Sequence, residues 1–124
     1  MISPVWNDPI ARARLMETAL DTIPSGVMLL DEAGVIVYAN QALLDGFGYS
    51  QLEGEPLVTL VPDWARAKHV EGFEGFLRSP AVDGPVCVKG RHRDGREIDV
   101  EVSVSYSRAY SRIIVCASCR VLES

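Results

Sequence analysis

Residues 26–54 constrain the fold more than any other stretch, because two short apolar runs there flank a turn and lead into a helix. The runs are Val27–Leu30 and Val35–Ala39. The tetrad between them, DEAG, has the composition of a tight turn in which Gly34 can take a positive φ angle. The pattern therefore predicts a β-hairpin.

A helix is expected directly after this hairpin. Asn40 is placed to be its N-cap, because its side chain can accept a hydrogen bond from a free amide two or three residues later. Apolar residues follow at helical spacing, and Gly46 and Gly48 end the run. These apolar residues are Ala42, Leu43, Leu44 and Phe47. The next tetrad, SQLE at residues 50–53, has the pattern of a capping box and predicts a further helical turn.

The N-terminal 25 residues predict a separate amphipathic helix. Asp8 followed by Pro9 is a strong helix start, with an N-cap and then a proline at the first helical position. Apolar residues recur at three- and four-residue steps until residues 24–26 (PSG) end the helix. They are Ile10, Ala13, Met16, Leu20 and Ile23. Such a helix packs either on its own domain or on a second protomer, and the sequence leaves both alternatives open.

A longer helix is expected from Trp64 to about Arg78, with Asp63 as its cap. On a helical wheel, one face carries a histidine among apolar and aromatic residues. That face consists of His69, Val70, Phe73, Phe76 and Leu77. The helix therefore presents an aromatic-rich stripe to whatever it covers.

Three strands complete the chain. Residues 85–90 and 96–106 are joined through Asp94-Gly95, a strong hairpin signal, and the second of these strands alternates apolar and polar residues. A last strand over residues 112–121 follows a loop around residues 107–111 and is apolar on both faces near its start. Two strands, then helices, then three strands predict an α+β fold, in which an antiparallel sheet carries helices on one face.

Five motifs in this order resemble the PAS domain family of sensor modules. They are D-x-x-G at residues 31–34, Tyr38-Ala39-Asn40, Gly48-Tyr49-Ser50, the R-x-x-H pair Arg66 and His69, and the hairpin GRHRDG at residues 90–95. The resemblance covers roughly residues 26–106. It implies a five-stranded sheet in the order 2-1-5-4-3 and a sensory or regulatory role in signal transduction.

The implied strand order also predicts an apolar patch on the outer face of the sheet. The segments 27–30, 35–39 and 113–117 are apolar on both faces, and in this order they become neighbours. A contiguous patch of this kind is rarely left in water. We expect the N-terminal helix to cover it, from the same chain or from a partner, and we expect a homodimer. The contact residues would be Ile10, Met16, Leu20 and Ile23.

The helix over residues 64–78 is expected to enclose a small, mainly apolar ligand against the sheet. His69 would be its polar handle, Phe73 and Phe76 its wall, and Trp64 would fill one end of the core or close the cavity. The floor would consist of Val86, Val88, Val100, Val102 and Val104. The alternative is an association module that binds no ligand, because its own side chains fill the core.

Haem is a further alternative that the resemblance raises. In the haem-binding, oxygen-sensing branch of the family, the histidine of the R-x-x-H helix is the iron ligand, and His69 matches it. That branch has an arginine where this chain has Val86, so we favour a core or pocket histidine over a haem ligand. The flavin-photosensing branch needs a cysteine that residues 54–61 (GEPLVTLV) lack, so flavin is not expected.

Neither a metal centre nor an active site is expected. Cys116 and Cys119 form a C-x-x-C pattern, but residues three apart on a strand point to opposite faces, so small apolar core cysteines are favoured. The sequence has no nucleophile elbow, no phosphate-binding glycine loop and no triad in a credible order. We therefore expect no enzymatic activity, and any output domain would lie outside this chain.

Length and charge limit the remaining functions. The 124 residues suffice for one domain, residues 26–124, preceded by the helix of residues 1–25. A net charge of −5 argues against nucleic acid or an anionic membrane as the main partner. The N-terminus lacks the features of a signal peptide, and no apolar run approaches the ~20 residues of a membrane span. We expect a cytoplasmic domain.

Overall fold

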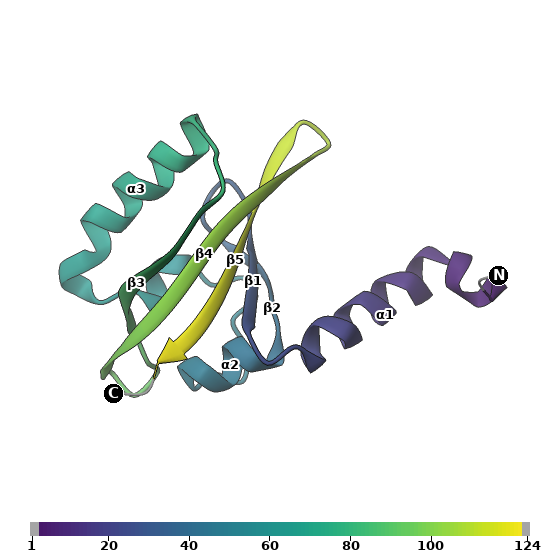
Figure 1. Ribbon diagram of the computed structural model, residues 1–124, viewed down its shortest axis with the longest axis horizontal. Coiled ribbons are helices and arrows are strands. Elements are labelled where there is room, and N and C mark those ends of the chain that lie inside the picture. The colour runs from purple at the N-terminus through teal and green to yellow at the C-terminus, as the bar shows by residue number, and fades with distance from the viewer. Residues whose placement is uncertain (1–2, 123–124) are drawn as a thin grey trace.

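The computed structural model describes residues 3–122 and consists of one antiparallel sheet with α-helices packed on one of its faces, as predicted, and an N-terminal helix that projects away from it (Figure 1). The strand order is β2-β1-β5-β4-β3, as predicted. The strands are β1 (Gly26–Leu30), β2 (Ile36–Ala39), β3 (Asp83–Arg91), β4 (Glu97–Ala109) and β5 (Arg112–Leu122). The α-helices are α1 (Pro9–Thr22), α2 (Gln41–Phe47) and α3 (Arg66–Arg78). Within the described residues, no helix is long and apolar enough to span a lipid bilayer.

Side-chain caps begin α1 and α2 at the predicted residues. The Asp8 carboxylate accepts a hydrogen bond from the Ala11 amide at 2.9 Å, and the Asn40 side chain accepts one from the Leu43 amide at 3.1 Å. α2 ends at Gly48, whose φ of 81° lies in the left-handed region that glycine adopts without strain. The predicted starts of α1 and α2 are therefore confirmed.

The prediction of a helical turn at residues 50–53 is wrong. This segment is not helical, and the next helical turn is a short 3₁₀ helix at Leu57–Leu60. The reason is a backbone interaction with the start of β2: the Ile36 amide donates to the Glu55 carbonyl at 2.9 Å, and the Gly54 amide donates to the Ile36 carbonyl at 2.8 Å. Pairing with β2 overrides the local capping-box signal.

The helix start expected at Asp63 also differs. Residues Asp63–Ala65 form a 3₁₀ turn, and α3 begins at Arg66 without a side-chain cap. This turn places Asp63 two residues before the N-cap position, which is Ala65, and the Asp63 carboxylate contacts two guanidinium groups instead.

The loop expected around residues 107–111 is a tight turn instead. β4 and β5 continue beyond the ends of their neighbours as a two-stranded hairpin that projects from the sheet (Figure 1). Tyr110 and Ser111 close this hairpin with φ angles of 52° and 61°. Positive φ angles at both central residues are the geometry of a two-residue type I′ turn. The sequence gives no sign of this turn, because tyrosine and serine are not the Asn, Asp or Gly residues that usually form it.

The core lies between α2 and the face of the sheet that we call the inner face. Met28 pairs with Ala117 and Leu30 pairs with Val115 across β1 and β5, and all four side chains are buried. Buried residues from α2 and the segments after it complete this core: Leu43, Phe47, Leu52 and Leu60.

Candidate functional site

The five valines predicted to form the floor of a ligand site share the inner face. Val86 pairs with Val102, and Val88 pairs with Val100. Val104 lies two residues after Val102 on β4 and therefore on the same face. Val100 is 1% exposed, whereas Val86 and Val88 are 47% and 46% exposed. The edge strand β3 therefore leaves apolar surface open on the side of the sheet where α3 lies (Figure 1).

The C-terminal half of α3 anchors the helix to the sheet. Phe73, Phe76 and Leu77 pack against the core. The Phe76 and Tyr106 rings meet edge to face, with centroids 6.2 Å apart. Phe73 lies beside the β1–β2 turn, because its Cε2 atom is 3.7 Å from the position that a Cβ atom on Gly34 would occupy. These residues bring the predicted aromatic wall to the sheet.

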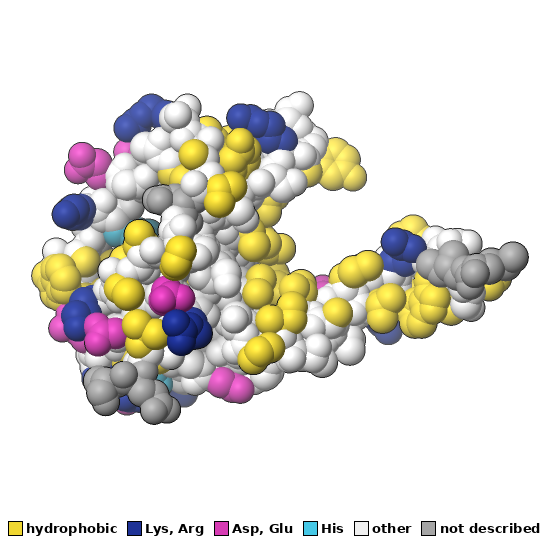
Figure 2. Space-filling view, viewed as in Figure 1, with side chains coloured by type: hydrophobic (Ala, Val, Ile, Leu, Met, Phe, Trp, Pro, Cys, Tyr) yellow, Lys and Arg dark blue, Asp and Glu magenta, His cyan; other side chains and the backbone are white. Residues whose placement is uncertain are grey.

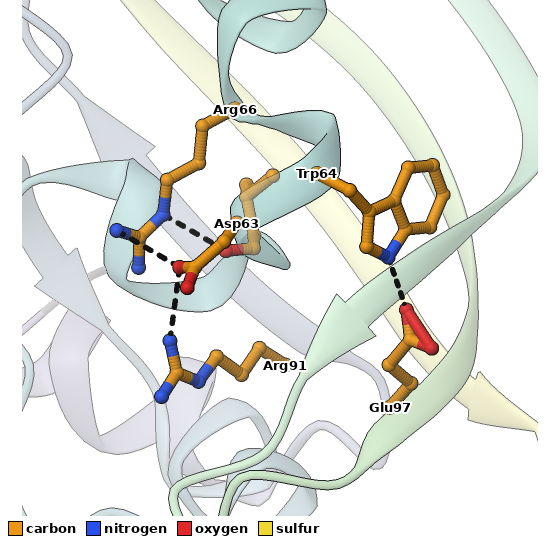
Figure 3. A network of polar contacts seen from close by, with 6 residues as sticks. Asp63, Trp64, Arg66, Arg91 and Glu97 are labelled. Carbon is orange, nitrogen blue, oxygen red and sulfur yellow. Dashed lines mark hydrogen bonds and ion pairs between the residues drawn. The ribbon is translucent and has the colours of Figure 1, made fainter.

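Polar contacts at the surface hold the start of α3 to the ends of β3 and β4 (Figure 3). Asp63 Oδ1 lies 3.2 Å from Nη1 of Arg66 and 3.2 Å from Nη1 of Arg91. The Trp64 indole N–H donates to the Glu97 carboxylate. The Trp64 side chain is 71% exposed, so the prediction that it fills one end of the core is wrong. The two strand contacts join residues 28 and 33 positions apart, which local spacing does not reveal.

His69 lies on α3 between these two anchored ends and is partly buried. Burial lowers the pKa of its imidazole below the ordinary value near 6.5, so the ring is neutral at pH 7. Within residues 3–122 the ring has no hydrogen-bond partner, and it belongs to no group of three metal-ligating side chains. One ring nitrogen can donate and the other can accept, and both remain free for a ligand.

Two small cavities lie elsewhere in the molecule. One, of about 210 Å³, lies between α2 and β5 and is lined by Ala42, Gly46 and Val121 among others. The other, of about 250 Å³, lies beside Leu44 and Leu52. Both are smaller than the ~300–1,000 Å³ typical of ligand pockets, so neither replaces the predicted site under α3.

The cysteines of the C-x-x-C pattern point to opposite faces, as predicted. Cys119 is buried on the inner face, and burial raises its thiol pKa to about 11. Cys116 is partly exposed and pairs with Leu29 of β1 on the other face. The two thiols therefore do not form a metal or redox pair.

The outer face of the sheet carries the apolar patch predicted from the strand order. This outer apolar patch comprises the exposed or partly exposed side chains Val27, Leu29, Val37, Tyr38, Ile114 and Cys116. α1 does not cover it, because none of its residues is buried and the helix projects away from the sheet (Figure 1). Covering by the same chain is therefore not what the structure shows, and covering by a partner stays a prediction.

A polar junction that the sequence did not predict joins α1 to the domain. Asn40, predicted as an N-cap, is also fully buried, and its Nδ2 donates to the carbonyls of Leu20 at 2.7 Å and Ser25 at 3.0 Å. The Asp21 carboxylate accepts from the Tyr38 hydroxyl at 3.1 Å. These bonds join residues 15 to 20 positions apart, so no local pattern could have revealed them.

The family model described as the PAS fold matches residues 14–122. A search of curated proteins found no match. Among solved structures, the PAS domain of nitrogen regulation protein NR(II) from Vibrio parahaemolyticus is 23% identical with a TM-score of 0.69, and the match covers 87% of this chain and 98% of that one.

Two further solved structures show the same fold. A PAS domain from Colwellia psychrerythraea is 16% identical with a TM-score of 0.77, covering 90% of this chain and 97% of that one. The PAS domain of an HTR-like protein from Haloarcula marismortui is 22% identical with a TM-score of 0.68, and the match covers 90% of this chain and 92% of that one. At identities of 16% to 23%, these likenesses show a shared fold and nothing more specific.

Proposed function

The chain belongs to the PAS domain family, and on that premise we propose that it is a sensory domain of a signal-transduction protein that binds a small, mainly apolar ligand between α3 and the sheet. Solved structures with this fold include a PAS domain from a two-component sensor histidine kinase. By the same proposal the domain itself is not catalytic, and its signal passes to an output domain outside residues 1–124.

The open apolar surface on β3 carries this proposal. Val86 and Val88 are paired with core-facing residues of β4, yet nearly half of each remains exposed. Burying apolar surface stabilises a complex by ~25 cal/mol per Å², so a small apolar molecule seated against these valines would gain binding energy. α3 is held to the domain at both ends, which leaves its middle, where His69 lies, free to contact such a ligand.

The polarity of the site indicates the kind of ligand. The predicted floor and wall are valines and phenylalanines, which offer a ligand no charged partner. Burying a charged ligand group against these side chains would be strongly unfavourable, because the group would lose its hydration without gaining a charged partner. His69 is neutral and keeps one donor and one acceptor free, so it suits a ligand with a single hydrogen-bonding group.

One observation favours the alternative of a ligand-free association module. Phe73 and Phe76 already pack against the core and against Tyr106. If the remaining space under α3 holds no ligand, this packing serves stability alone, and the exposed valines would be an edge of the domain or a surface for another protein.

We also propose that the domain signals as a homodimer. α1 exposes Ile10 to 67% and Met16 to 51%, and the outer apolar patch is also uncovered. Hydrophobic side chains line both sides of the hollow between α1, the sheet and the β4–β5 hairpin (Figure 2). Association of two copies would remove both apolar surfaces from water.

Native mass spectrometry of the protein purified without denaturation tests the ligand proposal. We expect the folded protein to carry one small molecule that is absent after denaturation, and to lose it in Val88→Arg. Equal native and denatured masses, together with no binding of added apolar compounds, would contradict the ligand proposal and favour the ligand-free association module. An absorption band of haem that disappears in His69→Ala would replace the apolar ligand with the haem alternative.

A further inference from the structure

We infer that Asp21, Tyr38 and Asn40 form a polar latch that holds α1 away from its own sheet and thereby reserves α1 and the outer apolar patch for a second copy of the chain. The inference rests on the proposed homodimer and adds the reason why α1 would pack on the partner rather than on its own domain.

Asn40 is the buried part of this latch. Its Nδ2 donates to the Leu20 and Ser25 carbonyls, while its Oδ1 accepts from the Val27 amide at 2.8 Å and from the Leu43 amide at 3.1 Å. One fully buried side chain thus joins the last turn of α1, the start of β1 and the first turn of α2. Both amide hydrogens and the carbonyl oxygen are used, so the joint is fixed in geometry.

Asp21 and Tyr38 form the outer part of the latch. Asp21 Oδ1 accepts from the Gln41 amide at 3.0 Å and from the Tyr38 hydroxyl at 3.1 Å. Burial and the bond to Asp21 raise the pKa of the Tyr38 phenol to about 12, so the hydroxyl keeps its proton across the physiological range. Tyr38 belongs to the outer apolar patch, so the latch sits at the point where α1 leaves that face.

The latch opposes folding of α1 onto its own sheet. The chain between α1 and β1 is only residues 23–25, so laying α1 on the outer apolar patch requires a rotation there. That rotation would carry the Leu20 carbonyl and the Asp21 carboxylate away from Asn40 and Tyr38. The buried amide of Asn40 would then lose its bond to Leu20 and keep only the one to Ser25, and a lost hydrogen bond is costly in a protein interior.

A second copy can cover both apolar surfaces while the latch stays intact. Both surfaces belong to one chain, so a two-fold arrangement lets α1 of each copy lie on the outer apolar patch of the other, as in other isologous dimers. The hollow between α1, the sheet and the hairpin is open to solvent on the face seen in Figure 2, which leaves room for the partner's helix.

The test compares the double variant Asp21→Ala/Tyr38→Phe with the wild type by small-angle scattering coupled to size-exclusion chromatography over a concentration series. Tyr38→Phe keeps the aromatic ring on the patch, and Asp21→Ala removes the acceptor. The matched control is Asp45→Ala/Tyr110→Phe, because Asp45 bonds to the Gln41 side chain without touching α1 and Tyr110 is 99% exposed. Circular dichroism verifies that each variant is folded.

We expect the wild type and the control to give an extended monomer at low concentration and a dimer at high concentration. The double variant should give a more compact monomer and a dimer about tenfold weaker, as the loss of two hydrogen bonds allows. Equal dimensions and equal dimer fractions in the double variant and wild type would overturn the latch. A wild type that stays monomeric would refute the homodimer, and the monomer dimensions would then still decide whether the latch holds α1 outward.

Discussion

The side-chain amide of Asn40 donates a hydrogen bond of 2.7 Å to the carbonyl of Leu20, so a buried residue of the domain holds the last turn of a helix that otherwise projects into solvent. The same side chain caps α2. The orientation of α1 and the integrity of the domain therefore depend on one residue.

Asn40→Ala should lower the free energy of unfolding by about 2–4 kcal/mol, because it removes an N-cap and leaves buried backbone groups without partners. Urea denaturation followed by circular dichroism measures the change. Gln41→Ala, at the exposed neighbouring position, is the control and should cost far less. Equal losses in the two variants would show that the buried bonds contribute little.

Gly48→Ala should destabilise the domain more than Gly54→Ala, although both glycines have positive φ angles, 81° and 89°. A Cβ atom on Gly48 would lie 2.3 Å from Cε1 of the His92 ring, whereas one on Gly54 would meet nothing within 4 Å. We expect about 1 kcal/mol for Gly54→Ala and about 2–4 kcal/mol for Gly48→Ala. Thermal or urea denaturation measures both, and equal costs would contradict the close contact with His92.

Stability should fall as the pH is lowered from 7 to 5, in part because of His69. Burial lowers its pKa in the folded state, so the unfolded chain binds a proton first. The contribution of His69 is therefore complete above its unfolded pKa near 6.5 and is lost as the pH falls through its lower folded pKa. His69→Gln should show a shallower pH dependence in urea titrations at pH 7, 6 and 5. Parallel curves for the two proteins would contradict this.

Phe73→Ala separates the ligand site from a filled core. Phe73 is only partly buried, so under the ligand proposal we expect a loss of about 1–2 kcal/mol together with loss of ligand binding. Phe47→Ala, at a residue 3% exposed in the core, is the control and should cost about 3–5 kcal/mol. A cost at Phe73 as large as at Phe47, with no effect on binding, would favour the association module.

The first hairpin and the caps of α1 and α2 could be predicted because they depend on local signals, whereas the strand order was implied by the family resemblance. Gly34, Asp8 and Asn40 act within a few residues of themselves, and the apolar patterns place each strand once the resemblance supplies the order. The same locality explains the errors. Residues 50–53 carry a helix signal that pairing with Ile36 overrides.

Long-range contacts account for the rest of what the sequence did not reveal. The sequence places Trp64 either at one end of the core or at the mouth of the cavity, whereas in the structure its exposed indole bonds to Glu97, 33 residues away. Asn40 was recognised as a cap, but its bond to Leu20 depends on how α1 leaves the sheet. The positions of the five floor valines on one face followed from alternation, whereas the exposure of Val86 and Val88 depends on where α3 lies, which spacing does not determine.

A fluorescence titration of the purified domain with 1-aminoanthracene, a neutral apolar probe with one polar group, tests directly whether the domain binds an apolar ligand between α3 and the sheet. Val88→Arg and Val37→Arg form a matched pair, because these valines are 46% and 44% exposed on opposite faces of the sheet. We predict saturable binding of one probe per chain, which Val88→Arg abolishes and Val37→Arg leaves intact. No saturable binding, or binding lost only in Val37→Arg, would contradict a ligand site between α3 and the sheet.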